Sequence, residues 1–285
     1  MTTATLVRPL GPFDLAASQR FACAAAQLCV GGTGEHVHLA FVPDGEPLSP
    51  VGACIRPVDG AVSIELYGDV ADEGRAIDQV VRILSLDVDA AAWPSVGERD
   101  PVIGRLMREQ PGFRPVNFVS PYECACWLLL THRTSMVQAT AVREAIAADF
   151  GASVDIHGDV RRAFPGPAAL HGLGAVDGLS AVKRARLRAV AEAALHTDLL
   201  DGVRLRSTAA EDAVDQLITA LPGVGQFTAQ GIVLRGAGAP DVLALAEPRL
   251  AACVERFYGD ADLGALAETW RPFRSWAQVL LRSAA

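Results

Sequence analysis

A short glycine-containing turn, Pro222-Gly223-Val224-Gly225, has the residue types and spacing that could bind an anion. Where such a turn opens a helix, its backbone N–H groups point outward, and the partial positive charge of the helix N-terminus favours a phosphate. The chemistry that this pattern predicts is recognition of phosphate by the main chain. The alternative interpretation is a purely structural turn between two helices.

The segments on both sides of this turn have the apolar periodicity of helices. The preceding helix is expected to begin at a capping box formed by Thr208 and Glu211. The following helix is expected to run from Gln226 to Arg235 and to end in a cluster of glycine and proline residues. The sequence therefore predicts a helix, a hairpin turn and a second helix. The apolar positions of the helix before the turn are Val214, Leu217, Ile218 and Leu221.

Residues 1–92 alternate between strand and helix patterns, which predicts a small sheet that carries helices. The dipeptide Asp59-Gly60 is typical of a tight hairpin turn and joins two of the strands. The six cysteines of the chain are scattered, and we interpret them as reduced core residues. Helices are expected over residues 14–30 and 72–86, and strands over residues 36–42, 51–56 and 62–67.

Residues 93–285 have helical patterns separated by short loops. Ser120, Pro121 and Glu123 combine an N-cap residue, an N1 proline and a capping-box acid, which predicts the start of a long buried helix. Its apolar pattern breaks at residues 131–135. The predicted fold class is α+β, with a sheet domain at residues 1–92 and an all-helical region at residues 93–285. Further helices are expected over residues 137–150, 160–169 and 181–195.

Composition limits the class of protein. The chain has 285 residues, of which 51% are hydrophobic, so it can bury a large core. It has no apolar run long enough to span a bilayer and no signal-peptide pattern at its start, so a cytoplasmic protein is expected. The net charge of −8 opposes binding of nucleic acid, although residues 1–120 carry most of it. The densest basic cluster, around Lys183, is either a solvated helix face or an anion-binding surface.

The hairpin and two later motifs resemble the helix-hairpin-helix superfamily of base-excision DNA glycosylases, specifically the 3-methyladenine DNA glycosylase II branch. The later motifs are Asp241-Val242-Leu243 and the run from Trp270 through Arg271 and Arg274 to Trp276. Further markers lie at residues 86–89, 100–106 and 120–124. The resemblance implies a small N-terminal βαβ-type sheet domain that supports an all-helical core. In this fold we expect Arg271 or Arg274 to form a structural pair with a carboxylate, with a phosphate contact as the alternative.

The same resemblance implies that the hairpin binds double-stranded DNA. Arg133 would stand at the minor groove, where a side chain fills the space left by an extruded base. His132 is a second candidate contact, with a capping or surface role as the alternative. No organic cofactor or metal is implied, although family members often hold a monovalent cation at the hairpin through backbone carbonyls. The residues expected to contact DNA are Leu221, Gly223, Val224, Gly225, Gln226, Thr228, His132 and Arg133.

Catalysis in the family depends on an aspartate near C1′ of the deoxyribose, six residues beyond the one that matches Asp241. This sequence has Glu247 there, followed by Pro248, so we expect Glu247 at a helix N-cap. Glutamate caps helices less well than aspartate, so Glu247 either serves catalysis or has drifted from the family pattern. Bifunctional relatives place a nucleophilic lysine where this chain has Phe227, so no lyase step is expected.

The base pocket is expected to contain Phe227, Gly231, Trp127, Tyr122 and Arg282. For the aromatic residues, and for Trp276, core packing is the alternative. Gly231 stands where well-known members have a tyrosine, so it would widen the pocket. Arg282 stands in place of a tryptophan and would repel cationic bases.

These features lead to the hypothesis of a monomeric, monofunctional DNA glycosylase associated with the nucleoid. It would flip an alkylated or otherwise damaged purine from duplex DNA and hydrolyse its N-glycosidic bond, with Glu247 as the catalytic residue. One alternative is a non-catalytic DNA-binding protein that has lost the family aspartate. Another is a hairpin that binds a protein partner and has no affinity for DNA.

Overall fold

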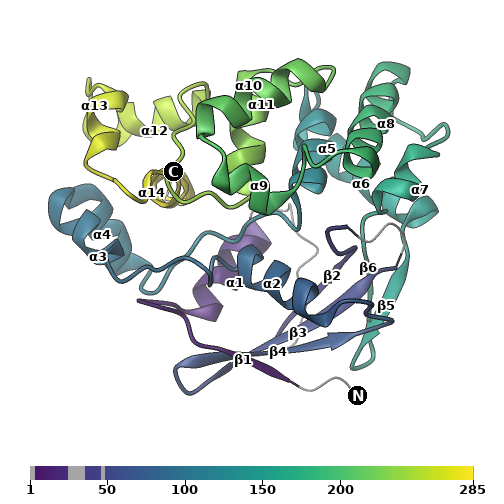
Figure 1. Cartoon of the computed structure of the whole chain (residues 1–285). Coiled ribbons are helices and arrows are strands. Elements are labelled where there is room, and N and C mark those ends of the chain that lie inside the picture. The colour runs from purple at the N-terminus through teal and green to yellow at the C-terminus, as the bar shows by residue number, and fades with distance from the viewer. Residues whose placement is uncertain (1–3, 25–35, 46–48, 285) are drawn as a thin grey trace.

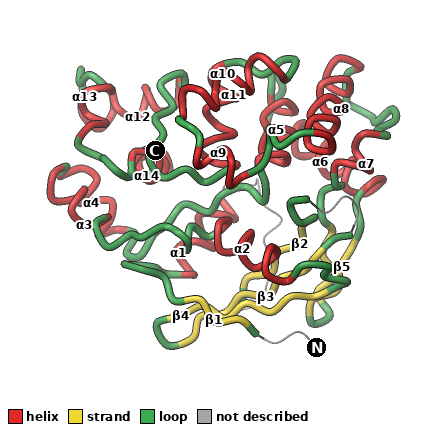
Figure 2. Tube along the Cα trace, in the orientation of Figure 1, coloured by secondary structure: helices red, strands yellow, loops and turns green. Residues whose placement is uncertain are grey.

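The computed structural model describes residues 4–24, 36–45 and 49–284. A small sheet forms one layer of the molecule and a set of helices forms the other, with α1 (Leu15–Ala24) and α2 (Glu73–Ile83) between them (Figures 1 and 2). This arrangement confirms the predicted α+β class. No helix within the described ranges is long and apolar enough to cross a bilayer.

The sheet has four strands in the order β1-β4-β3-β2, and every neighbouring pair is antiparallel. The chain begins with a strand, a helix and a second strand, as expected of a βαβ-type domain. However, its strands do not pair in the parallel manner of a βαβ crossover. The predicted turn at Asp59-Gly60 is confirmed, since Val58 pairs with Ala61 and Gly60 has φ 67°. The strands are β1 (Thr5–Val7), β2 (Val37–Phe41), β3 (Val51–Val58) and β4 (Ala61–Tyr67).

Because successive side chains of a strand point to opposite sides, the sheet has two faces with different residues. Leu39, Ile55 and Ile64 lie on the face that packs against α1 and α2, where they form one hydrophobic core. The predicted helix at residues 72–86 is α2, and the Asp72 side chain caps it by accepting from the Arg75 N–H at 2.9 Å. The predicted helix at residues 14–30 is described as far as Ala24, and its remaining residues lie outside the described ranges.

The opposite face of the sheet is covered by a two-stranded hairpin, β5 (Ser153–Ile156) and β6 (Asp159–Arg162). The expectation of only helices after residue 93, including one over residues 160–169, was therefore wrong. His157 and Gly158 both have positive φ, 53° and 84°, so they form a tight turn that joins two strands. The helix of this segment, α7 (Pro167–His171), begins only after Gly166.

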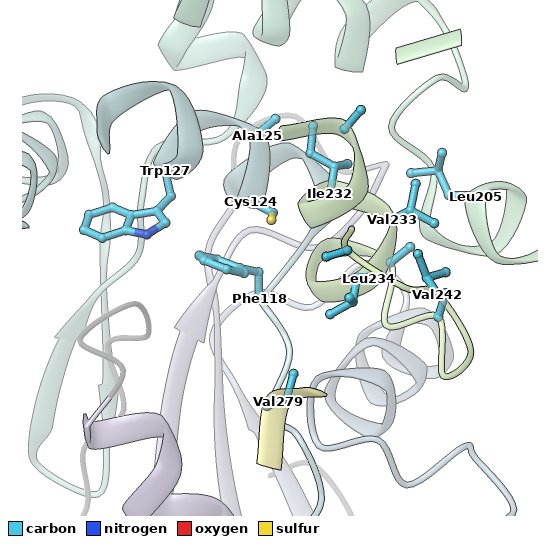
Figure 3. Packing of buried hydrophobic residues seen from close by; sticks show 14 of the residues in the cluster. Phe118, Cys124, Ala125, Trp127, Leu205, Ile232, Val233, Leu234, Val242 and Val279 are labelled. Atoms are coloured by element: carbon cyan, nitrogen blue, oxygen red, sulfur yellow. The ribbon is translucent and has the colours of Figure 1, made fainter. Parts of the chain in front are cut away.

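The helical layer surrounds a second, larger core that extends from residue 88 to residue 281. Its central contacts bring α5 (Pro121–Thr131) against the turn of π-helix η1 (Ile232–Gly236), as Figure 3 shows. The other helices are α3 (Trp93–Arg99), α4 (Pro101–Glu109), α6 (Met136–Phe150), α8 (Ala181–His196), α9 (Gly202–Ser207), α10 (Ala210–Ala220), α11 (Gln226–Gly231), α12 (Pro248–Tyr258), α13 (Leu263–Glu268) and α14 (Arg274–Ser283).

Two of the predicted helix starts can be compared with the structure. Ser120 caps α5, because its hydroxyl oxygen accepts from the Glu123 N–H at 3.0 Å. The Thr208 capping box was wrong. Thr208 ends α9 by donating its hydroxyl to the Arg204 carbonyl oxygen at 2.8 Å, and α10 begins at Ala210 without a side-chain cap.

Arg114 joins the sheet region to the helical layer and was not singled out from the sequence. It is fully buried and donates to backbone carbonyl oxygens of four residues, at distances of 2.5–3.1 Å. Burial lowers its pKa to about 10, so the guanidinium stays charged at neutral pH. The carbonyls belong to Leu10, Pro12, Ser85 and Val88.

Candidate active site and nucleic-acid interface

Glu247 occupies the N-cap position of α12, as the following proline predicts. Its backbone is extended there, with φ −91° and ψ 110°, but its side chain caps no N–H group. The carboxylate instead pairs with Arg282 of α14, at 2.8 Å from Nη1 to Oε1 and 3.1 Å to Oε2. Only 8% of the Glu247 side chain is exposed. The side chain is therefore held in place by an ion pair rather than by the start of its own helix.

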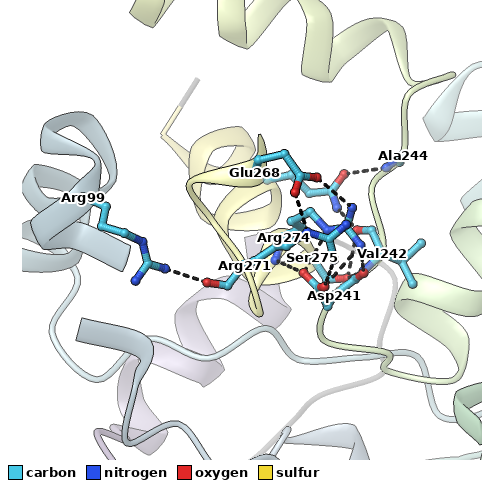
Figure 4. A network of polar contacts seen from close by, with 9 residues as sticks. Arg99, Asp241, Val242, Ala244, Glu268, Arg271, Arg274 and Ser275 are labelled. Atoms are coloured by element: carbon cyan, nitrogen blue, oxygen red, sulfur yellow. Dashed lines mark hydrogen bonds and ion pairs between the residues drawn. The ribbon is translucent and has the colours of Figure 1, made fainter. Parts of the chain in front are cut away.

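The loop that leads to Glu247 is fixed to α14 by a polar network (Figure 4). Asp241 accepts from Arg274 Nε at 2.9 Å and from Arg271 Nη1 at 2.8 Å. Gln278 donates to the Val242 carbonyl oxygen at 2.6 Å and accepts from the Ala244 N–H at 3.1 Å. The expected structural pairing of the C-terminal arginines is confirmed. Because α14 also carries Arg282, one helix positions both the loop and the partner of Glu247.

Glu247 lies on the wall of a cleft of about 480 Å³, which we call the Glu247 cleft. This volume lies within the roughly 300–1,000 Å³ of small-molecule sites. The structure brings four of the five expected pocket residues to the cleft, which runs between α5, α11 and α14. Its walls include Phe118, Cys124, Trp127, Leu128, Met136, Phe227, Gly231, Arg235, Glu247, Arg249, Gln278 and Arg282.

Tyr122 is the expected pocket residue that the structure does not bring to this cleft. It lies on the other side of α5, where its hydroxyl donates to the Pro165 carbonyl oxygen at 2.9 Å and it lines a different cavity. Trp276 is 2% exposed and packs edge-on against Trp93, so core packing is its role. Neither aromatic ring can stack on a base in the Glu247 cleft.

Gly231 lines the cleft but does not widen it as expected. A Cβ atom there would lie 2.8 Å from Cδ1 of Leu128, so the Leu128 side chain fills the space that a larger residue would take. Trp127 and Phe227 remain as the aromatic wall residues. Trp127 is 3% exposed, whereas Phe227 is 38% exposed and stands at the open side.

Three arginines surround the Glu247 carboxylate. Burial raises the pKa of Glu247 above its ordinary value, and the positive charges of Arg282, Arg235 and Arg249 oppose that rise. Arg235 was not predicted from the sequence as a residue of this pocket. It lies in η1, donates to the Val116 carbonyl oxygen at 2.8 Å, and its buried Nε has no partner among the described residues. Because this Nε is buried, a ligand in the cleft does not reach it, and Arg235 acts on Glu247 through its positive charge.

The hairpin turn has the predicted geometry. Gly223 has φ 83°, a conformation that glycine adopts without strain, and the Val224 N–H closes the turn by donating to the Leu221 carbonyl oxygen at 3.1 Å. The Leu221 and Val224 side chains are buried, so only their backbone can reach a ligand. Gly225 and Gln226 are exposed at the start of α11, where N–H groups have no acceptor within the helix.

Thr228 and His132 hold the hairpin to the end of α5. Thr228 is 2% exposed and its hydroxyl lies 2.9 Å from His132 Nε2, so its side chain is not free for the contact with DNA that the sequence predicts. Burial, together with the charges of Arg186 and Lys183, lowers the pKa of His132, which favours its neutral form. His132 thus positions the turn that follows α5 against the hairpin.

A second depression of about 810 Å³, the basic groove, adjoins the hairpin. Arg133 is exposed at the tip of the turn after α5 and has φ 50°. The Lys183 amine donates to the Leu130 carbonyl oxygen and to the Thr134 hydroxyl, which ties α8 to the same turn. The basic cluster at the start of α8 therefore faces the hairpin instead of standing apart from it. The groove is lined by His132, Arg133, Thr134, Gly178, Ser180, Val182, Lys183, Arg186 and Gly223.

Replacing Gly223 by alanine should destabilise the protein by about 1–2 kcal/mol. A left-handed φ costs a non-glycine residue about 1–2 kcal/mol, and the added Cβ would lie 2.3 Å from Arg186 Nε. Chemical denaturation measures the change. The matched control is Gly225→Ala, because Gly225 has φ −111° and its added Cβ meets no atom within 4 Å. Equal stability of the two variants would contradict the assigned turn geometry.

Comparison with known proteins agrees with this geometry. No family model matches the chain. The "Probable bifunctional transcriptional activator/DNA repair enzyme AlkA" of Mycobacterium tuberculosis is 31% identical over 216 residues, which are 73% of this chain and 42% of that protein. The chain thus spans less than half the length of this relative.

Solved structures share the fold. The 3-methyladenine DNA glycosylase of Archaeoglobus fulgidus superposes with a TM-score of 0.77 at 18% identity, over 99% of this chain and 97% of its own. The 8-oxoguanine glycosylase/lyase of Clostridium acetobutylicum superposes with a TM-score of 0.61 at 14% identity, over 90% and 97%. The resemblance identified from the sequence is confirmed: the chain is homologous to AlkA and shares its fold with solved DNA glycosylases.

Proposed function

We propose that this protein is a monofunctional DNA glycosylase of base excision repair. It binds double-stranded DNA at the hairpin, flips a damaged purine into the Glu247 cleft and hydrolyses the N-glycosidic bond. The observation that carries this proposal is the Glu247 carboxylate on the wall of a cleft of about 480 Å³. Its site of action would be the chromosome in the cytoplasm.

The reaction requires one anion near C1′. The base leaves with the bonding electrons, the sugar gains cationic character, and a carboxylate stabilises that charge. Water then forms the new bond to C1′ and gives up a proton, for which Glu247 is the acceptor within the cleft. Of the residues that line the cleft, Glu247 is the one carboxylate. No cofactor enters these steps.

The absence of a lyase step is supported by the position of the lysine. A Schiff base with the sugar needs an amine at the reacting carbon. Lys183 is the sequence's single lysine, and it lines the basic groove, where its amine bonds Leu130 and Thr134. Phe227, which stands in place of the nucleophile of bifunctional relatives, lines the Glu247 cleft.

The charges of the cleft favour a neutral lesion. Arg235, Arg249 and Arg282 line it together with a single carboxylate, so a positively charged alkylpurine would meet net repulsion. A neutral modified purine carries no charge and so avoids this repulsion. We therefore propose neutral modified purines as the preferred substrates.

The phosphate backbone would follow the hairpin and the basic groove. Gly225 and the first residues of α11 offer N–H donors, while Arg133 and Arg186 supply positive charge beside them. We propose that the same turn holds the family's monovalent cation, with the Leu221 carbonyl oxygen as one ligand, since this oxygen accepts from the Val224 N–H and has a second lone pair. Arg133 would fill the space left by the flipped base.

A duplex containing one 1,N6-ethenoadenine tests the proposal. We expect release of free base and an abasic strand that stays intact until alkali is added. Strand cleavage without alkali, accompanied by covalent trapping with borohydride, would contradict the monofunctional assignment. No base released from etheno, deaminated or methylated duplexes, with DNA binding retained, would support the non-catalytic alternative.

A further inference from the structure

A cluster of metal-binding side chains lies on the face of the sheet that the β5–β6 hairpin covers. The strand register places His38 directly opposite Cys54, and Cys54 directly opposite Glu65, on three adjacent strands. His36 precedes His38 by two residues, so it belongs to the same face. His157, from the turn of the hairpin, approaches the cluster from above and lies within hydrogen-bond distance of Tyr67. The cluster shares no residue with the lining of the Glu247 cleft.

The ligand atoms of this cluster are close together. One donor atom each from His36, His38 and Cys54 lie within 4.8 Å of one another, as do those of Cys54, Glu65 and His157. Cys54 Sγ lies 3.9 Å from His36 Nδ1. Tetrahedral zinc, with bonds of about 2.0–2.3 Å, separates its ligand atoms by roughly 3.3–3.8 Å. Side-chain adjustments of about 1 Å would therefore complete the coordination.

His38 is held in the orientation of a metal ligand. It is 5% exposed, and its Nδ1 lies 2.8 Å from the Asp159 carboxylate. Its other ring nitrogen, Nε2, is buried and has no hydrogen-bond partner in the described part of the chain. Leaving a buried nitrogen without a partner is unfavourable, and a bound ion would remove that cost. A carboxylate that orients a histidine through one nitrogen, while the other binds the ion, is a common arrangement around zinc.

We propose that His36, His38 and Cys54 bind a zinc ion, with its fourth coordination position open toward Glu65 and His157. Imidazole and thiolate are ligands that zinc prefers, whereas magnesium and calcium prefer oxygen. Binding releases the Cys54 thiol proton to solvent and forms a zinc–sulfur bond. Glu65 is already paired with Arg56 at 2.7 Å and accepts from the Tyr67 hydroxyl at 2.9 Å, which leaves His36, His38 and Cys54 as the core of the site.

The proposed ion would join β2 and β3 beneath the hairpin that covers them. β5 and β6 follow α6 in the chain, so they belong to the segment that leaves the helical layer and returns to it. Because Asp159 of β6 orients His38, the ion would also secure the hairpin to the sheet. Its expected role is structural, and its binding should raise the melting temperature.

Titration of the full chain with Co²⁺, after removal of metal by a chelator, tests the site. We expect one equivalent to bind with the absorption of tetrahedral cobalt and a thiolate-to-cobalt charge-transfer band, and Zn²⁺ to displace it. Zn²⁺ alone should raise the melting temperature of the same sample. Absence of a saturable site in the unmodified protein would overturn the proposal, whatever the variants do.

Three variants identify the ligands. Cys54→Ser should remove the charge-transfer band, and Asp159→Asn should retain the band but weaken binding about 10- to 100-fold. Cys253→Ser is the matched control, because Cys253 is a buried free cysteine in α12 and should leave the band unchanged. A band that persists in Cys54→Ser, or is lost in Cys253→Ser, would contradict the assignment.

Discussion

Replacing Glu247 by glutamine should reduce the rate of base release by about 10²- to 10³-fold or more. The amide has nearly the same size but no charge, so it removes the electrostatic stabilisation of the sugar cation and the acceptor for the proton of water. DNA binding should persist, because the hairpin and the basic groove are unaltered. Single-turnover release from an etheno-adenine duplex measures the effect, and a filter or gel assay measures binding.

Two further variants determine whether the charge of Glu247 is the cause. Glu247→Asp keeps the charge but withdraws the carboxylate by about 1 Å, so an intermediate loss of about 10²-fold or less is expected. Glu255→Gln removes an exposed carboxylate from the same helix and should leave the rate unchanged. If Glu247→Gln releases base at the unmodified rate, another group performs the reaction.

The hairpin and the position of Glu247 could be predicted because local rules determine both. The turn itself requires a glycine at position 223, where φ is 83°. Pro248 fixes the start of α12 immediately after Glu247. The ion pair with Arg282 could not be predicted in the same way. It joins residues 35 positions apart, and it depends on how the Asp241 network holds the loop to α14.

The errors have equally specific causes. Almost every residue of α5 is buried, so no polar face indicated on which side Tyr122 would lie. The side chain of Leu128 fills the space beside Gly231, which only a tertiary contact could reveal. Arg235 lies in a π-helical turn, where the usual helical spacing no longer gives the direction of a side chain. The β5–β6 hairpin depends on positive φ at His157, a residue type that does not by itself signal a turn.

Replacing Arg282 by glutamine should shift the substrate preference toward cationic lesions. A unit charge about 8 Å from a cationic base, at an effective dielectric constant of about 20, contributes roughly 2 kcal/mol, or about 30-fold in relative rate. Arg282 is 28% exposed, and this dielectric constant allows for the resulting solvent screening. The measurement is the ratio of N7-methylguanine release to etheno-adenine release, because effects of the variant on Glu247 itself cancel in that ratio.

The same variant should change the pH dependence of both reactions. Burial already raises the pKa of Glu247, and Arg282 is the largest influence that opposes the rise. Removing the positive charge of Arg282 therefore raises the pKa of Glu247 further. Because the reaction requires the carboxylate, the rate falls as the pH drops through this pKa, so the acid limb should move to higher pH. Arg249→Gln, at an exposed position of the cleft, should produce the same changes at smaller amplitude, since solvent screens its charge more strongly. An unchanged lesion ratio in Arg282→Gln, with the acid limb shifted, would show that Arg282 sets the ionisation of Glu247 but not the choice of base.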